Sequence, residues 1–210
     1  MGMEGGIARW YAKLTRKSLP EFEQLAQRMA ASLPSGARVL EVAPGPGYFS
    51  VALAKLGTYE IAGLDVSKTF VEIAHNNAKE AGVSVDFQQG NASRMPFAND
   101  RFDLVLCRAA FKNFSEPVRA LAEMRRVLRA GGRAVVIDLR HDTPQEEINR
   151  HVDAMKVGAV NAAFTKWAFR FMLLKRAYTR EQFERMIAEA AWQTCEIAEA
   201  PVGFEITLTK

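Results

Sequence analysis

The chain alternates short apolar runs with amphipathic segments between residues 39 and 139, and this alternation limits its possible folds more than any other feature. The apolar runs, which predict strands, lie at 39–42, 59–64, 83–88, 102–107 and 134–139. The segments between them predict helices, because apolar residues recur there at helical spacing. Parallel strands need crossover helices, which cover both faces of a sheet. The pattern therefore predicts an α/β fold with a doubly wound, mostly parallel sheet.

Further elements are predicted on either side of this core. Two late strand-like runs, 194–198 and 204–209, are separated by Pro201 and Gly203 and predict an antiparallel hairpin. The sheet would then have seven strands. We expect one domain over 1–210, organised as an N-terminal helical segment (1–36), a cofactor-binding core (37–140), a helical cap inserted after strand five (141–178), and a last helix with the hairpin (179–210).

Composition narrows the class of protein. Hydrophobic residues make up 49% and charged residues 25% of 210 positions, which excludes disordered and collagen-like chains. Cys107 and Cys195 lie far apart without a CxxC spacing, so we predict no metal site and expect both to be buried apolar residues. The sequence also lacks a membrane-length apolar run and the apolar core of a signal peptide, which favours a cytoplasmic protein.

The segment most informative about chemistry joins the first strand to the next helix. Glu41 lies in that strand, and glycines follow at positions 45 and 47. Glycine lets the backbone approach a ligand, and the helix that follows offers unpaired N–H groups. Asp65 ends the next strand, about 20 residues on, where a carboxylate can accept hydrogen bonds from ribose hydroxyls. These residues predict a site for a nucleoside-containing cofactor.

Two cofactor classes compete for this geometry. A dinucleotide loop favours GxGxxG or GxGxxA, and here Ser50 occupies the third place. Glu41 can lie beside the ammonium group of an amino acid portion, whereas it would repel a pyrophosphate. The combination favours S-adenosylmethionine over NAD.

These motifs resemble the class I S-adenosylmethionine-dependent methyltransferases of the small-molecule type, over roughly residues 38–139. The resemblance implies a Rossmann-like fold and the following cofactor-binding residues: Tyr11, Glu41, Ala43, Gly45, Gly47, Asp65, Val66, Asn91, Ala92 and Arg108. Ala43 replaces the first of three spaced glycines, a mild change because a methyl group adds little bulk. Asn91 stands where aspartate is commoner, and its carbonyl can still accept a bond from the adenine amino group.

The catalytic residues are less well defined than the cofactor site. Many members of the family carry two histidines after the fourth strand, where this chain has Lys112 and Asn113. Methyl transfer is an in-line displacement in which alignment and exclusion of water supply much of the catalysis. Weak candidates for a base are His141, Asp142 and His151, although a lone histidine near a strand end is more often a satisfied or solvent-facing residue.

Aromatic residues near the expected site have two interpretations each. Trp10 and Tyr11 could close over the cofactor as a lid, or pack on the core, with equal weight. In the cap, Phe164, Trp167, Phe171 and Leu174 follow a helical stripe that either roofs the acceptor pocket or forms core. The cap is also basic, which allows contact with an anionic membrane surface, but a solvated face is the favoured interpretation.

The sequence thus predicts a methyltransferase acting on a small, partly apolar acceptor. The alternatives are an NAD-dependent oxidoreductase and a protein that binds S-adenosylmethionine without catalysis. Nucleic acid is disfavoured as a partner because no aromatic and basic stripe suited to stacking bases stands out. The sequence makes no prediction of oligomeric state.

Overall fold

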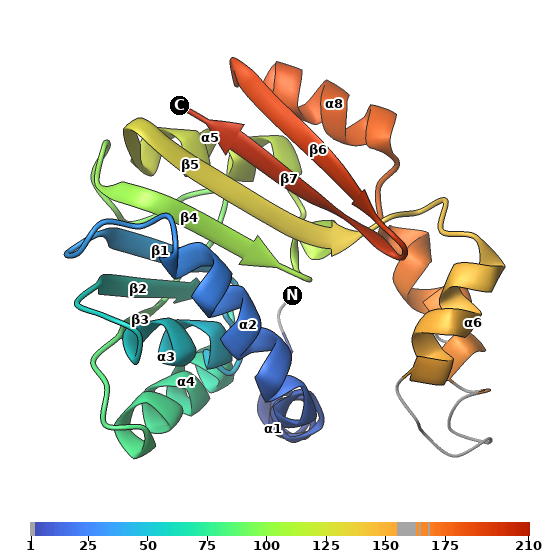
Figure 1. Ribbon diagram of the computed structural model, residues 1–210, viewed down its shortest axis with the longest axis horizontal. Coiled ribbons are helices and arrows are strands. Elements are labelled where there is room, and N and C mark those ends of the chain that lie inside the picture. The colour runs from blue at the N-terminus through green and yellow to red at the C-terminus, as the bar shows by residue number, and fades with distance from the viewer. Residues whose placement is uncertain (1–2, 155–162, 164, 168) are drawn as a thin grey trace.

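The computed structural model, which describes residues 3–154, 163, 165–167 and 169–210, is built on one seven-stranded sheet (Figure 1). The strands run in the order β3-β2-β1-β4-β5-β7-β6, with β1 to β5 parallel and β6 and β7 antiparallel. Their bounds are β1 Arg38–Val42, β2 Glu60–Asp65, β3 Asp86–Gln89, β4 Phe102–Arg108, β5 Leu128–Leu139, β6 Thr194–Ala200 and β7 Gly203–Thr209. The predicted doubly wound sheet with a C-terminal hairpin is confirmed.

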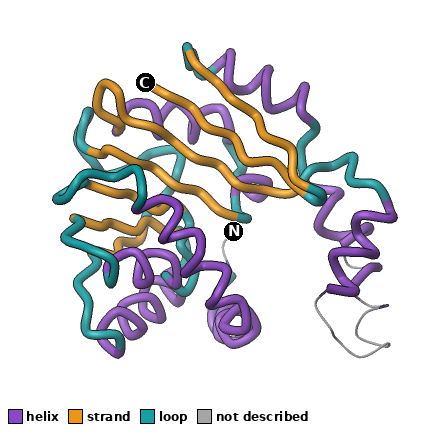
Figure 2. The backbone as a smooth tube through the Cα atoms, viewed as in Figure 1, coloured by secondary structure: helices purple, strands orange, loops and turns teal. Residues whose placement is uncertain are grey.

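Helices cover both faces of the sheet (Figure 2). The α-helices are α1 Gly5–Thr15, α2 Leu19–Ala30, α3 Tyr48–Ala54, α4 Lys68–Glu80, α5 Pro117–Val127, α6 Gln145–Ala154 and α8 Arg180–Glu189. Short helical turns are η1 Arg16–Ser18, η2 Phe111–Asn113, η3 Phe169–Leu173 and η4 Leu174–Arg176. Ser67 and Thr179 cap α4 and α8, since their hydroxyls accept from the backbone N–H groups of Phe70 and Gln182.

Two apolar cores follow from the alternation of side chains along each strand. In β1, Val39 packs with α2, α3 and α4 on one face, and Leu40 packs with α5 and α8 on the other. Leu104 and Val105 divide in the same way in β4, and all four side chains are fully buried. Because both faces are covered, the central strands read as continuous apolar runs.

Two strands differ from their predicted limits. β3 begins at Asp86 instead of position 83, because the N–H of Val83 still donates to the Ala78 carbonyl and completes the turn after α4. β5 begins at Leu128 instead of position 134, with Gly131 and its neighbour inside the strand where the register to β4 shifts. These glycines therefore lie at an irregularity within the strand.

Two further expectations have a clear outcome. Cys107 is fully buried, but Cys195 is exposed on the edge strand β6, so the prediction of a buried residue was wrong there. Position 195 lies on β6, the outermost strand of the sheet, which is more exposed than the central strands. Within the described part of the chain, no helix is both long and apolar enough to cross a membrane.

Candidate active site

The loop between β1 and α3 lies at the carboxyl edge of the parallel strands, where open α/β sheets bind their ligands. Gly45 and Gly47 both have left-handed backbone, with φ of +53° and +74°. A Cβ on Gly45 would meet no protein atom within 4 Å, whereas one on Gly47 would come within 2.6 Å of the Phe87 ring. The glycines therefore differ in their surroundings, because Gly45 borders open space and Gly47 lets the loop pack against β3.

Ala43 has the same left-handed backbone, with φ of +56°. For an alanine this conformation costs about 1–2 kcal/mol, which a glycine would avoid. The sequence argument considered only the bulk of the methyl group. The structure shows that the preference for glycine here concerns backbone conformation instead.

Asp65 links the loop after β1 to the start of α4. Its Oδ2 accepts from the N–H of Gly45 at 3.0 Å, and its Oδ1 accepts from the N–H of Ser67 at 2.9 Å. Burial raises the pKa of this carboxyl, and the two backbone hydrogen bonds oppose that rise. The half-exposed Val66 follows directly. The predicted pair of Gly45 and Asp65 is therefore in direct contact.

Glu41 is 3% exposed and is held from the helix side of the loop. Its Oε2 accepts from the hydroxyl of Ser50 at 2.6 Å and from the Ser50 N–H at 3.2 Å. Burial raises the pKa of Glu41 to about 7, although the bonds from Ser50 and the charge of Arg108 oppose the shift. The serine that weakened the dinucleotide interpretation thus has a structural use, because it anchors the acid to α3.

Replacing Glu41 by glutamine should stabilise the protein above neutral pH. Between the ordinary value of 4.5 and about 7, the folded state holds a proton that the unfolded chain releases. The free energy of unfolding of the wild type therefore falls as pH rises through that window. Glu41→Gln removes this loss, so at pH values above the window we expect a gain of up to about 3 kcal/mol and at acidic pH almost none. Urea titrations at a series of pH values measure it.

The exposed Glu72 on α4 provides the control, because its carboxylate stays in water. Glu72→Gln should follow the pH profile of the wild type. A Glu41→Gln profile parallel to the wild type across the whole range would show that burial does not raise the pKa of Glu41.

Tyr11 in α1 and Arg108 at the end of β4 are close enough for the charge of Arg108 to act on the Tyr11 hydroxyl. The Tyr11 ring packs edge-on against Phe70, with ring centroids 5.9 Å apart. Burial raises the pKa of Tyr11, the Arg108 charge lowers it, and the Asp138 charge raises it further. The Arg108 guanidinium pairs with Glu21 at 3.0 Å. Tyr11 is half-buried, but Trp10 is 63% exposed, so packing on the core is wrong for Trp10.

The segment expected to hold adenine follows β3. Its first residue, Gly90, donates from its N–H to the Asp65 carbonyl at 2.8 Å, which keeps the segment beside the loop. The side-chain carbonyl of Asn91 accepts from the N–H of Ser93 at 2.8 Å and shapes the turn. Ala92 is half-buried against the core. The role of Asn91 and Ala92 toward adenine stays a prediction.

A buried ion pair that the sequence analysis missed joins η2, after β4, to the end of β5. Lys112, in η2 after β4, donates from Nζ to Asp138 Oδ1 at 2.8 Å and to the Ala109 carbonyl at 2.7 Å. The backbone N–H groups of Lys112 and Leu139 also donate to the Asp138 carboxylate, at 2.8 and 2.7 Å. The side chains are 6% and 1% exposed. Two features could have revealed the pair, an acid within the apolar run 134–139 and a lysine between phenylalanines.

The three candidate bases take part in other contacts or lie farther along the chain. His141 Nδ1 lies 2.8 Å from the Leu174 carbonyl, which ties the cap to the end of β5. Asp142 forms a two-point pair with Arg140, which holds the pKa of Asp142 below its ordinary value and makes it a weaker base. His151 lies half-buried in α6. Their catalytic roles stay predictions.

The aromatic side chains of the cap are more exposed to solvent than residues of an apolar core. Trp167 and Phe171 are 50% and 51% exposed, and their ring centroids lie 5.9 Å apart. The core interpretation was therefore wrong for both, while Leu174 is buried against α6. Phe164 lies outside the described residues. The cap extends beyond the carboxyl end of β5 (Figure 1).

Comparisons with known proteins find similar methyltransferases. A methyltransferase domain family matches residues 40–136. The chain is 38% identical over 112 residues to the uncharacterised methyltransferase YcgJ of Bacillus subtilis, covering 53% of this chain and 43% of that protein. It is 38% identical over 102 residues to the demethylmenaquinone methyltransferase of Deinococcus radiodurans, covering 48% of this chain and 42% of that protein. The chain thus spans less than half the length of both relatives.

The fold extends the similarity beyond the matched segment. A crystal structure from Methanococcus maripaludis, assigned to the S-adenosyl-L-methionine-dependent methyltransferases, superposes with a TM-score of 0.78. The comparison covers 97% of this chain and 91% of that one, at 22% identity. At that identity the likeness shows the fold alone.

Proposed function

We propose that the chain is a class I S-adenosylmethionine-dependent methyltransferase that transfers a methyl group to a small, partly apolar acceptor. The observation that carries the proposal is the contact between Gly45, whose missing side chain leaves open space, and Asp65, whose carboxylate lies beside it. This pair suits an adenosine portion. The carboxylate can accept hydrogen bonds from the ribose hydroxyls, and the glycine lets the ligand come close to the backbone.

The residues around the loop fit the whole cofactor. When bound, S-adenosylmethionine supplies a methyl carbon already activated by its sulfonium. Asp65 would hold the ribose, and Glu41 would contribute negative charge near the amino acid portion. Tyr11, half-buried above the edge, would limit access of water. The chain then has to align the acceptor and keep the site dry, which needs no protein nucleophile.

The acceptor is proposed from two observations. The half-exposed Trp167 and Phe171 offer apolar surface on the cap, near the end of β5. The relative from Deinococcus radiodurans is named for demethylmenaquinone, so demethylmenaquinone is the first acceptor to assay. Transfer of isotope-labelled methyl to that compound supports the class, and absence of transfer with cofactor bound favours a binding protein or a different acceptor.

Replacing Asp65 by alanine tests the cofactor site. We expect the affinity for S-adenosylmethionine to fall by about 1.5–3 kcal/mol, the range for a hydrogen bond to a charged group. The melting temperature should fall too, because the N–H groups of Gly45 and Ser67 lose their acceptor. Calorimetric titration of the folded variant with S-adenosylmethionine gives the affinity, and a titration of the wild type with NAD tests the oxidoreductase alternative.

Asp103 supplies a matched control at the opposite, amino edge of the sheet. Its carboxylate also accepts a backbone N–H, from Arg38 at 2.7 Å. Asp103→Ala should lower stability and leave cofactor affinity unchanged. Equal affinities for Asp65→Ala and the wild type would remove Asp65 from the site, and tighter binding of NAD than of S-adenosylmethionine would overturn the proposed cofactor.

A further inference from the structure

The outward side of α1 carries an apolar stripe. Ile7, Trp10 and Leu14 are 64%, 63% and 47% exposed, and spacings of three and four residues place them on one face of the helix. The opposite side of α1 packs inward through Ala8 and Ala12, which are buried. Large apolar side chains gathered in this way mark an interaction surface, whereas single exposed ones do not.

Four cations flank this stripe. Arg9, Lys13, Arg16 and Lys17 lie within α1 and η1, and no acid occurs between positions 5 and 18. Their charge of +4 equals the formal net charge of the whole chain. Among the described residues, none of the ion pairs involves any of the four. At 100° per residue, Arg9 and Lys13 lie on one flank of the apolar stripe, between it and the buried alanines.

The cap is the other basic segment, and its cations are differently placed. Lys166 pairs with Asp153 at 2.7 Å, and Arg170 donates to Gln145 at 2.6 Å. Those charges are partly satisfied within the protein. The surface of α1 is therefore the stronger candidate for an external anion.

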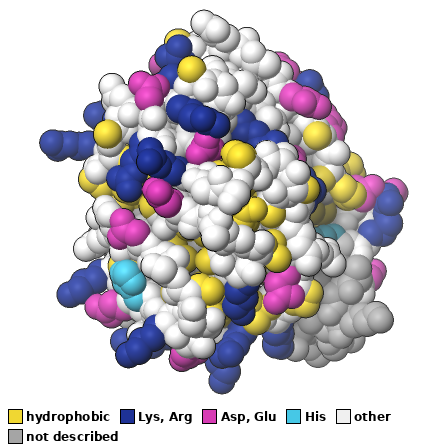
Figure 3. Space-filling view, turned by 60° about the vertical axis from the view of Figure 1, so that its left-hand side comes forward, with side chains coloured by type: hydrophobic (Ala, Val, Ile, Leu, Met, Phe, Trp, Pro, Cys, Tyr) yellow, Lys and Arg dark blue, Asp and Glu magenta, His cyan; other side chains and the backbone are white. Residues whose placement is uncertain are grey.

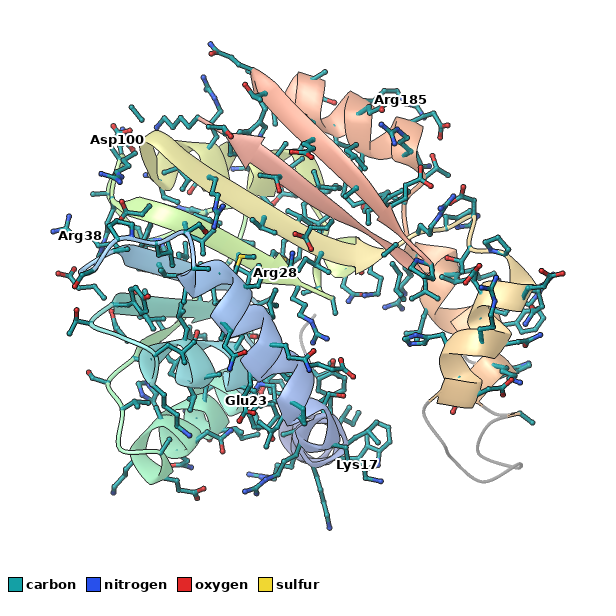
Figure 4. All side chains as sticks on the ribbon, viewed as in Figure 1. Lys17, Glu23, Arg28, Arg38, Asp100 and Arg185 are labelled. Carbon is teal, nitrogen blue, oxygen red and sulfur yellow. The ribbon has the colours of Figure 1, made fainter. Side chains whose placement is uncertain are left out.

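The surface lies on one margin of the molecule. Helix α1 is at the bottom of Figure 1, and in Figure 3, turned about the vertical axis, basic side chains gather along the lower margin together with hydrophobic ones. Figure 4 shows Lys17 at this margin and Arg185, on α8, at the opposite one. Tyr11 on the same helix approaches the charge of Arg108 at the candidate active site.

We propose that α1 docks on an anionic lipid surface, with its apolar stripe in the boundary between headgroups and acyl chains. A helix that combines exposed Trp and aliphatic residues with a basic flank suits this position, since the cations reach the headgroup phosphates while the stripe leaves water. A second copy of the chain suits the α1 surface less, because the four cations of one copy would repel the four cations of the other. Nucleic acid would contact the cations but leave Ile7 and Leu14 in water.

Sedimentation with vesicles tests this surface on the full chain. The wild type should bind vesicles of mixed phosphatidylcholine and phosphatidylglycerol, release as salt rises, and stay in solution with phosphatidylcholine alone. Lys13→Gln with Lys17→Gln should lower the partition coefficient by about thirtyfold, since each cation near such a surface contributes about 1 kcal/mol. Trp10→Ser with Leu14→Ser should lower it by about tenfold or more.

A matched pair, Lys79→Gln with Arg185→Gln, removes the same charge from exposed positions on α4 and α8 and should leave partition unchanged. The proposal is overturned if the wild type ignores anionic vesicles, if this pair loses as much binding as the α1 pair, or if the stripe variants abolish dimerisation or DNA binding instead. Docking does not rest on the proposed function, because S-adenosylmethionine titration without vesicles should give the wild type and the two paired charge variants equal affinities.

Discussion

Replacing Asp138 by alanine should lower the free energy of unfolding by about 3–5 kcal/mol, because it strands a buried charge. In the wild type, Asp138 accepts from Lys112 Nζ and from the N–H groups of Lys112 and Leu139. The variant leaves the ammonium of Lys112 with the Ala109 carbonyl alone and leaves two backbone donors without their acceptor. Urea unfolding of both proteins under identical conditions measures the loss.

Two further variants show whether the buried charge is the cause. Combining Asp138→Leu with Lys112→Met removes both charges and should recover part of the loss, since an apolar pair of similar volume tolerates the site. Glu184→Ala breaks the exposed pair with Arg180 and should cost no more than about 1 kcal/mol. If Asp138→Ala costs no more than this surface variant, the pair does not hold the loop after β4.

The fold was predictable from the sequence because its rules are local. Apolar runs bounded by glycine and proline indicated each strand, and helical spacing between them required parallel crossovers. The limits of β3 and β5 were less predictable, because neighbouring backbone decides them. Val83 belongs to the turn after α4, and Gly131 lies inside β5. Residue type alone does not distinguish a strand from a turn at either position.

The site was predictable at positions where the chemistry of a residue type points to a single role, as for a glycine in a tight loop or an acid at the end of a strand. Gly45 and Asp65 are in contact as the spacing suggested, although Gly47 faces Phe87 instead of open space. Pairings between distant segments were not predictable. Lys112 and Asp138 are 26 positions apart, and the register of β4 with β5 brings η2 next to the end of β5. The exposure of Trp167 and Phe171 likewise depends on how the cap sits, which helical spacing alone does not reveal.

Introducing valine at Gly45 should abolish cofactor binding in a chain that still folds. The backbone there is left-handed, and a side chain would project into space that no protein atom occupies. We expect the affinity for S-adenosylmethionine to fall about a hundredfold or more, because a ligand that fills this space would overlap the added atoms. Calorimetric titration of the purified variant measures the affinity, and far-ultraviolet circular dichroism checks the fold.

Gly36 separates the effect on the ligand from the backbone strain that valine causes at positive φ. It has φ of +75°, and a side chain there would also meet nothing within 4 Å, but it lies before β1, at the amino edge of the sheet. Gly36→Val should therefore lose comparable stability while keeping wild-type affinity. If both variants lose affinity in proportion to stability, strain explains the result, and the loop after β1 does not form the cofactor site.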